Sequence, residues 1–243
     1  MYIQSEKNKI IKEINALKLK KNRDKLGLFV VEGERLVKEA LDIADYVVVS
    51  ESFSSDIKAD YVVKDSIFNK ICDTVTPQGV LAVCKMMKNE YKNDIDNPFY
   101  IMLENVQDPG NMGTIVRTAD AAGADGVFLS KGCVDIYNPK VIRSTMGSLF
   151  HLPVYKNMDL IDVLKDIKVP TIAAHLKGDK TPYDVDMKNG IVILIGNEGN
   201  GLTDELTAVA DSLVKIPMPG KSESMNAAVA AAIMIYEAVR QRL

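Results

Sequence analysis

The chain has 243 residues, of which 47% are hydrophobic and 26% are charged, and its formal net charge at pH 7 is −3. These values are typical of a globular protein with one large domain or two modest ones. We expect neither a membrane span nor a secretory signal, because no apolar run approaches the roughly 20 residues that cross a bilayer and the N-terminus lacks an apolar core.

The first predicted element is an amphipathic helix over residues 6–20, where apolar residues recur at helical spacing from Ile10 to Leu17. The net charge alone argues against a nucleic-acid binder, but eight basic residues and only two acidic ones lie between Lys7 and Lys25. Such a local excess can attract phosphate, since distant charges are screened within about 10 Å. The alternative is a solvated helix face, which is the commoner meaning of a charge run.

Short strands and helices alternate after this helix and predict a small α/β domain. Residues 86–98 are polar, lack clear periodicity and close with Asn97-Pro98, so we interpret them as a linker. The sequence therefore predicts two domains, residues 1–94 and 95–243. In the first domain we expect strands at residues 28–31, 46–49, 61–63 and 80–83, and helical segments at residues 34–41 and 67–72.

The second domain is predicted to be an α/β domain with a buried parallel sheet, because β-branched residues run almost without interruption through Ile191–Ile195. Asn111 and Ser224 are the expected N-caps of two of its helices, and Gly123 is an expected C-cap. The final helix is small and apolar on almost every face, so it should pack against the sheet or a second subunit. We expect strands at residues 99–103, 126–129, 171–174, 191–195 and 213–216, and helices after residue 111, from about 140, at 159–166 and at 226–242.

Three polar segments follow predicted strands of this domain: Asn105–Arg117, Ile195–Leu202 and Ile216–Asn226. Ligands of α/β proteins bind at such strand ends, so the three segments predict one composite site. The glycine loop at residues 196–201 is either a cofactor cradle or a tight turn, and its spacing fits neither a P-loop nor a Rossmann fingerprint. Arg117 could pair with Asp120 or reach water, or it could bind an anion.

Metal chemistry is not indicated by the sequence. The three cysteines are scattered without a C-x-x-C pair, so we expect neither a zinc site nor a disulfide framework. Buried or incidental thiols are the favoured interpretation, and they suggest the reducing cytoplasm.

The three segments together resemble the motifs of the SpoU family, the TrmH-like branch of the SPOUT RNA methyltransferases. The matches are N-x-G-x-x-x-R-T-A at Asn111–Ala119, G-N-E-G-x-G-L at Gly196–Leu202, and I-P-M-x-G-x-x-x-S-x-N at Ile216–Asn226. The resemblance covers residues 99–243 and implies a parallel sheet with a C-terminal trefoil knot, an exception to the rule against knots. It also implies a homodimer formed through the C-terminal domain.

The resemblance further implies methyl transfer from S-adenosylmethionine to a ribose 2′-hydroxyl of RNA. Because a guanidinium scarcely loses its proton, we expect Arg117 to stabilise the developing alkoxide or a neighbouring phosphate. Met225 departs from the Leu of many members, a change of similar volume. The catalytic positions implied are Asn111, Arg117, Glu198, Ser224 and Asn226, and the cofactor-binding positions are Gly196, Glu198, Gly199, Ile216, Met225 and Asn226.

The first domain resembles the ribosomal-protein-like, substrate-binding extension that some members carry, on the softer cues Phe29–Gly33 and Pro77–Leu81. This favours ribosomal RNA over transfer RNA as the substrate. Two alternatives stay open: a non-catalytic RNA-binding relative, and a nucleotide-dependent enzyme built around the glycine loop. The basic residues expected to contact RNA are Lys9, Lys12, Lys20, Lys21 and Arg23.

Overall fold

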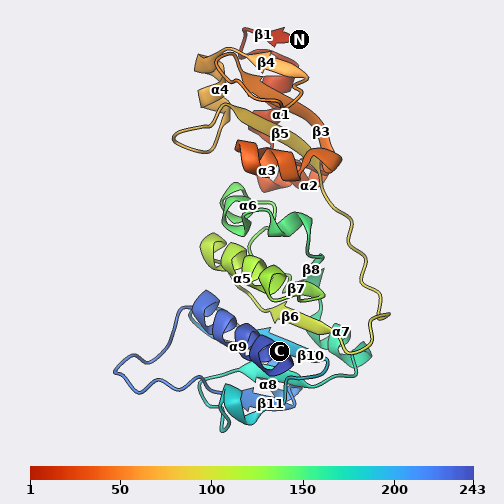
Figure 1. Cartoon of the computed structure of the whole chain (residues 1–243), viewed down its shortest axis with the longest axis vertical. Coiled ribbons are helices and arrows are strands. Elements are labelled where there is room, and N and C mark those ends of the chain that lie inside the picture. Colours follow the sequence, from red (N-terminus) through yellow and green to blue (C-terminus); the bar gives the residue numbers. More distant parts are fainter. The chain divides into compact units, whose positions relative to one another are not determined.

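The computed structural model describes all 243 residues, and the chain divides into two compact units (Figure 1). Unit 1 comprises residues 1–88 and 137–150, and unit 2 comprises residues 89–136 and 151–243. Residues 86–98 contain no helix or strand. The inclusion of residues 137–150 in unit 1 was not anticipated from the sequence.

Unit 1 contains a mixed five-stranded sheet with the order β1-β4-β3-β5-β2. β5 is antiparallel to both β2 and β3, whereas β4 is parallel to β1 and β3. The four predicted strands are present, and β1, which has only two residues, is an addition. The strands are β1 (Tyr2–Ile3), β2 (Leu28–Glu32), β3 (Ala44–Ser50), β4 (Tyr61–Val63) and β5 (Val80–Lys85).

The single helix expected over residues 6–20 is in fact two helices, α1 (Lys9–Ala16) and α2 (Lys20–Leu26). The chain turns between them because Arg23 donates through Nη1 to the carbonyl oxygens of Leu17 and Lys18, at 2.9 Å each. Ile11 and Ile14 of α1 are buried in the core, as their spacing predicted. The remaining helices are α3 (Glu34–Glu39), η1 (Leu41–Ile43), α4 (Asp65–Ile71), α6 (Pro139–Thr145) and η2 (Ser148–Phe150).

Unit 2 is built on a six-stranded sheet with the order β11-β9-β10-β6-β7-β8, in which every pair of neighbours is parallel. The predicted parallel sheet is therefore confirmed. Leu103 pairs with Ile195 on one side and with Leu129 on the other, so β6, β10 and β7 end at the same edge. The strands are β6 (Phe99–Leu103), β7 (Gly126–Ser130), β8 (Val154–Met158), β9 (Thr171–Ala174), β10 (Ile191–Ile195) and β11 (Ser212–Val214).

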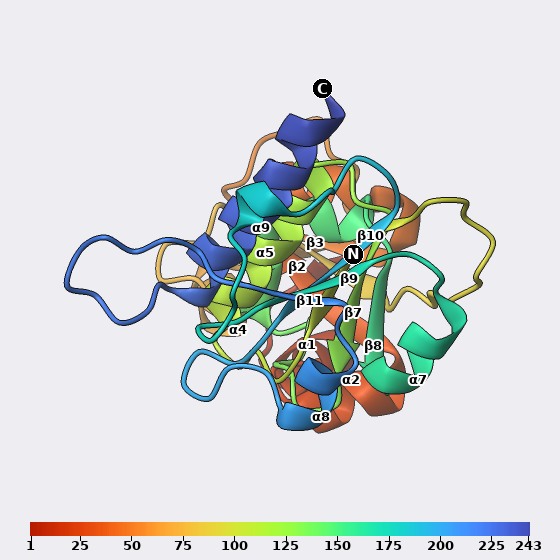
Figure 2. The same ribbon diagram turned by 90° about the horizontal axis from the view of Figure 1, so that it is seen from below.

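The helices of unit 2 are α5 (Pro109–Ala121), α7 (Leu160–Asp166), η3 (Pro182–Asp184), α8 (Asp204–Ala208) and α9 (Ala227–Arg242). α5 and α9 pack side by side, and the segment between β11 and α9 extends outward as a long loop (Figure 2). No helix of the protein combines the length and the hydropathy that a membrane crossing requires. The trefoil knot stays a prediction.

Two predicted helix caps are wrong. α5 is capped by Asp108, whose Oδ1 accepts from the backbone N–H of Asn111 at 2.7 Å. Pro109 then takes the first helical position, where its missing N–H costs nothing. α9 is capped by Asn226 rather than Ser224. Both corrections place the amide side chains of Asn111 and Asn226 at helix starts, where they are free to bond to other segments.

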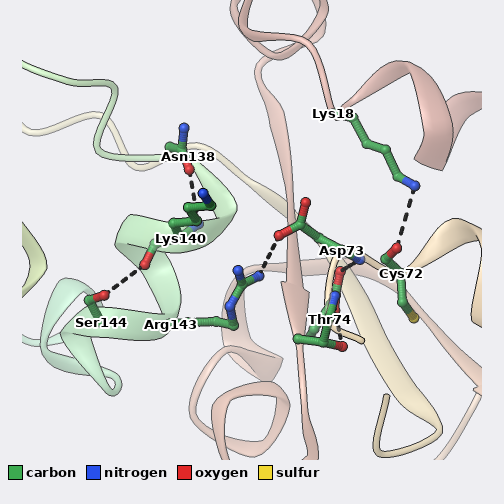
Figure 3. A network of polar contacts seen from close by, with 9 residues as sticks. Lys18, Cys72, Asp73, Thr74, Asn138, Lys140, Arg143 and Ser144 are labelled. Atoms are coloured by element: carbon green, nitrogen blue, oxygen red, sulfur yellow. Dashed lines mark hydrogen bonds and ion pairs between the residues drawn. The ribbon is translucent and has the colours of Figure 1, made fainter. Parts of the chain in front are cut away.

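Segment 137–150 is held in unit 1 by aromatic, polar and ionic contacts. The Tyr137 ring lies 4.6 Å from that of Phe29, and its hydroxyl accepts from the N–H of Met87 at 3.0 Å. Figure 3 shows the ion pair between Arg143 Nη1 and Asp73 Oδ2, at 2.8 Å. Hydrophobic periodicity does not reveal such contacts between distant residues, which explains why the segment was not assigned to this unit from the sequence.

Candidate active site

The candidate site lies where β6 and β10 end. The N–H of Glu104 donates to the carbonyl oxygen of Ile195 at 2.9 Å and extends the pairing by one residue. The Glu104 carboxylate then accepts from the N–H and the hydroxyl of Thr203, at 2.7 and 2.8 Å. The glycine loop between Ile195 and Thr203 is therefore fixed at both ends to the strand edge.

Glu198, within this loop, accepts hydrogen bonds from the segment that follows β6. Its Oε1 accepts from Nδ2 of Asn111 at 3.0 Å and from the N–H of Asp108 at 3.3 Å, and its Oε2 accepts from the N–H of Gln107 at 3.4 Å. Partial burial raises the pKa of the Glu198 carboxyl, but these donors outweigh burial and the net pKa is lowered. Glu198 is therefore held as an ionised acceptor.

Asn226 adds the third sequence segment to the same cluster. Its Nδ2 donates to Oδ1 of Asn111 at 2.9 Å, and its Oδ1 accepts from the N–H groups of Ala228 and Val229. An ionised carboxylate only accepts hydrogen bonds, and helix N–H groups only donate them. The orientations of both amides between Glu198 and α9 are consequently fixed by their partners. The structure thus joins Asn111, Glu198 and Asn226 directly, which confirms that the three segments converge.

The glycine loop has the features of a cofactor cradle. A Cβ on Gly196 would lie 2.2 Å from the carbonyl carbon of Gly201, so only glycine allows this close approach. Gly201 adopts a φ of 72°, and Asn197 and Gly201 exchange backbone hydrogen bonds of 2.9 and 3.0 Å. Gly199 at the tip is exposed. The loop can therefore present backbone groups to a ligand at close range.

The apolar positions expected to bind the cofactor lie on the extended segment between β11 and α9. Ile216 is half-buried, whereas Met225 and Ser224 are exposed. The only hydrogen bond at Ser224 is made by its carbonyl oxygen, which accepts from the Ser222 hydroxyl at 2.8 Å. An adenosyl ligand needs a hydrophobic surface for its base and polar backbone for its edges, which these apolar side chains and the glycine loop could supply if they meet.

Arg117 is exposed on α5 and forms no hydrogen bond or ion pair within the chain. It does not pair with Asp120, whose carboxylate lies 3.7 Å from Nδ1 of His151. Within one chain, no hydrogen bond joins Arg117 to Glu198, Ser224 or Asn226. The expectation that these residues orient Arg117 therefore receives no support from contacts inside a single chain.

Sequence reasoning missed Asn197, whose side chain links the glycine loop to the segment after β6. Its Oδ1 accepts from the N–H of Gly199 at 2.8 Å, and its Nδ2 donates to the carbonyl oxygen of Asn105 at 2.7 Å. The available signal was an Asn at the start of a glycine turn, where its side chain commonly bonds to the backbone two residues on. The backbone N–H groups of Gln107 and Asp108 were also missed.

The five basic residues that were expected to contact RNA differ in their exposure and in their partners. Lys9, Lys12 and Lys21 are exposed and form no ion pair, whereas Lys20 lies 2.8 Å from Asp24. Arg23 is a correction, because it is only 3% exposed and its guanidinium donates to backbone carbonyls of the α1–α2 turn. It is therefore a structural residue and presents no charge to RNA.

Comparison with known proteins assigns the chain to a family. Residues 98–236 match the SpoU rRNA methylase family, and residues 8–82 match the MRM3-like substrate-binding domain. Among curated relatives, a protein of Bacillus subtilis named 23S rRNA (guanosine(2553)-2′-O)-methyltransferase is 36% identical over 96% of this chain and 97% of its own length.

Solved structures agree with this assignment. An S-adenosylmethionine-bound rRNA methyltransferase of Sinorhizobium meliloti superposes with a TM-score of 0.90 at 34% identity, covering 100% of this chain and 98% of its own. The SpoU methyltransferase AviRb of Streptomyces viridochromogenes, in complex with S-adenosylmethionine, gives a TM-score of 0.89 at 27% identity, covering 97% and 98%. The chain therefore belongs to the SpoU rRNA methylase family and is an S-adenosylmethionine-dependent RNA 2′-O-ribose methyltransferase.

Proposed function

We propose that this enzyme methylates a ribose 2′-hydroxyl of ribosomal RNA, and that the reaction takes place at the cluster of Glu198, Asn111 and Asn226. The observation that carries the proposal is the convergence of these three residues from three distant segments, through hydrogen bonds of 3.0 and 2.9 Å. Two relatives that match most of this chain are named as rRNA methyltransferases, which favours ribosomal RNA over transfer RNA.

The cofactor would be held by the glycine cradle and by apolar side chains that follow β11. Gly196 and Gly199 would offer backbone groups, Ile216 and Met225 would pack against the adenine, and Asn226 would fix the loop at the start of α9. When bound, S-adenosylmethionine supplies a methyl group on a positively charged sulfur that is already activated for transfer. The protein then has to position the 2′-hydroxyl and stabilise the charge that develops on it.

Arg117 is our candidate for this stabilisation. Its guanidinium has five N–H donors in a planar fork, none of which is used within the chain. It would bind the developing alkoxide or the adjacent phosphate. Ser224, exposed on the outer segment before α9, would help to orient the ribose.

The active form would be a homodimer assembled through unit 2. α9 exposes Val229 and Tyr236, about half of each side chain, and they flank the half-buried Ile233 on one face of the helix. An apolar face of this kind on a surface helix is typical of a protein–protein interface. A partner subunit would cover it, and a partner could also supply contacts to Arg117 that a single chain lacks.

The RNA would be bound in part by unit 1, through the exposed lysines Lys9, Lys12, Lys20 and Lys21. A cytoplasmic location agrees with three free thiols. Burial raises the pKa of Cys72 and of Cys84 to about 12, so these two thiols stay protonated and unreactive in the folded protein.

The test is methyl transfer with a labelled donor. Purified enzyme is incubated with methyl-labelled S-adenosylmethionine and with ribosomal or transfer RNA from cells that lack the gene. We expect label in ribosomal RNA, at a nucleotide whose 3′ linkage resists alkali because its 2′-oxygen is blocked. Label in transfer RNA alone would replace the proposed substrate, and label on a base would overturn ribose methylation.

A further inference from the structure

Asn197 is the residue on which the following inference depends. Its side-chain amide lies between two loops of the site, the glycine loop at residues 196–201 and the segment at 105–108 that follows β6. Oδ1 accepts from the N–H groups of Gly199 and Asn200, at 2.8 and 3.1 Å. Nδ2 donates to the carbonyl oxygen of Asn105 at 2.7 Å, and more weakly to Oε2 of Glu198 at 3.4 Å.

The orientation of this amide is fixed by its partners. Rotation by 180° would bring Oδ1 against the Asn105 carbonyl oxygen, and Nδ2 against the N–H groups of Gly199 and Asn200. Each of these contacts would place two acceptors or two donors together. Asn197 therefore holds the turn of the glycine loop with one end and the neighbouring loop with the other.

The acceptor on Asn105 is itself held in place. Asn105 adopts a φ of 54°, a left-handed conformation that few residues other than glycine and asparagine tolerate. Its N–H donates to the hydroxyl of Ser130 at 3.0 Å. Its Oδ1 lies 1.6 Å from the place that a Cβ on Gly132 would take. Ser130, the last residue of β7, and Gly132, two residues beyond it, thus fix the backbone that Asn197 contacts.

The contact between Asn197 and Asn105 helps to set the spacing of the two loops. Two and three residues after Asn105, the N–H groups of Gln107 and Asp108 donate to Glu198, at 3.4 and 3.3 Å. These bonds are long, so they depend on a loop separation that is determined elsewhere. Glu104 fixes the two ends of the glycine loop, and the 2.7 Å bond from Asn197 to Asn105 fixes the loop beside Glu198.

We propose that Asn197 is a positioning residue for methyl transfer, whose amide clamps the glycine loop to the segment after β6 and so aims Glu198 at Asn111. The inference rests on the proposed function of this site. The residue does not touch the reacting atoms. It acts through Glu198, and a displacement of about 1 Å at a reacting centre costs on the order of 100-fold in rate.

The variant that tests the clamp is Asn197→Asp. The new side chain keeps an oxygen for the N–H groups of Gly199 and Asn200, so the turn of the glycine loop is preserved. It loses the donor to Asn105 and places a negative charge beside Glu198. We expect kcat to fall by about 10- to 100-fold. Binding of S-adenosylmethionine, measured by calorimetry, should weaken as well, because the cradle is no longer held.

Asn200→Asp is the matched control. It introduces the same charge in the same loop, at an exposed side chain that forms no hydrogen bond. Because Asn200 lies in the cradle, its loss of kcat measures the effect of charge alone, and the clamp predicts a clearly larger loss for Asn197→Asp than for Asn200→Asp. If both variants lose activity equally, charge in the loop is the cause and the clamp is refuted.

Lowering the pH toward about 4, near the ordinary pKa of an Asp carboxyl, provides a readout specific to the clamp. Once protonated, the introduced carboxyl can donate to the Asn105 carbonyl oxygen, so the activity of Asn197→Asp relative to wild type should rise. The ionisable side chains beside the two loops are Glu104, Asp108 and Glu198, which wild type and variant share, so the activity ratio isolates the new group. A ratio that is the same at every pH would overturn the proposal.

Folding is checked by thermal unfolding of each variant. If Asn197→Asp does not fold, Asn197→Ser takes its place, because serine keeps an oxygen for the loop but is too short to reach Asn105. Near-normal kcat for a folded Asn197 variant overturns the clamp while the proposed function stands, since wild-type turnover on ribosomal RNA is measured in the same assay. Absence of wild-type turnover would instead refute the function.

Discussion

Asn226 donates a 2.9 Å hydrogen bond to Asn111, although the two residues are 115 positions apart in the chain. The bond has a direction, because Asn111 in turn donates to the Glu198 carboxylate and Asn226 accepts from the first N–H groups of α9. Donors therefore point from α9 through both amides toward Glu198. This fixed direction of the hydrogen bonds predicts that an Asn→Asp substitution lowers activity strongly, although the two side chains are nearly equal in size.

Asn111→Asp should lower kcat/KM by about 100-fold. The variant replaces the donor to Glu198 with a second carboxylate at hydrogen-bond distance, and two carboxylates this close repel each other strongly. Methyl transfer to ribosomal RNA measures the loss. Asn189→Asp is the control in the same unit, since its exposed side chain forms no hydrogen bond. Equal losses of kcat/KM in both variants would contradict a specific role for the hydrogen bond from Asn111 to Glu198.

Glu198→Gln should destabilise the protein in a pH-dependent manner. The pKa of Glu198 is lowered in the folded state, so the folded protein favours the ionised form more than the unfolded chain does. The stabilisation is then complete above the ordinary pKa of 4.5 and is lost as the pH falls through the lower folded value. The difference in Tm between wild type and Glu198→Gln should shrink on acidification, and a difference that grows would show that the sign is wrong.

Arg117→Ala should lower kcat by about 100- to 1,000-fold and leave S-adenosylmethionine binding within about twofold. The reason is that Arg117 has no partner in the chain, so its removal disturbs no internal contact. Turnover and calorimetry are measured separately. Arg117→Lys keeps the charge but loses the planar fork of donors, and its kcat should be intermediate. Near-normal turnover of Arg117→Ala would exclude the proposed role.

Val229→Glu should shift the protein from dimer to monomer, as measured by analytical ultracentrifugation. A charge placed in an apolar interface loses its water without gaining a partner. Val209→Glu is the matched control, because Val209 is 45% exposed and Val229 is 51% exposed, but Val209 follows α8 rather than lying on α9. A monomeric wild type, or equal dissociation by both variants, would refute the proposed interface.

Charge reversal at Lys12 and Lys21 should weaken RNA binding and flatten its dependence on salt. Each lysine that contacts phosphate contributes to the release of counterions, so each loss reduces the salt slope by about one unit. Lys58→Glu is the control, because it reverses the charge of an exposed lysine that forms no ion pair and lies outside the basic run between Lys7 and Lys25. Affinity that falls equally for Lys58→Glu would show that the effect is nonspecific.

Local patterns were enough to predict most of the secondary structure. The strand at Ile191–Ile195 was predicted with the bounds that the structure gives, because both faces of a central parallel strand are buried and its apolar run is continuous. β8 was not predicted, since Lys156 and Asn157 are exposed on this edge strand and interrupt the pattern. The helix expected over residues 6–20 was too long because helical spacing does not reveal where a side chain such as Arg23 turns the chain.

The sequence by itself determined the parallel sheet, the three polar segments and the family, because these depend on which residues are present and how they are spaced. Only the tertiary structure decided that Asn226 rather than Ser224 caps α9, that Arg23 is buried, that residues 137–150 belong to unit 1 and that Asn197 contacts Asn105. For residues 137–150 and for Asn197 the partners are distant in sequence, so the choice exists only once the chain has folded. For Asn226 and Arg23 the partners are near in sequence, but several local partners compete, and packing of the folded chain decides among them.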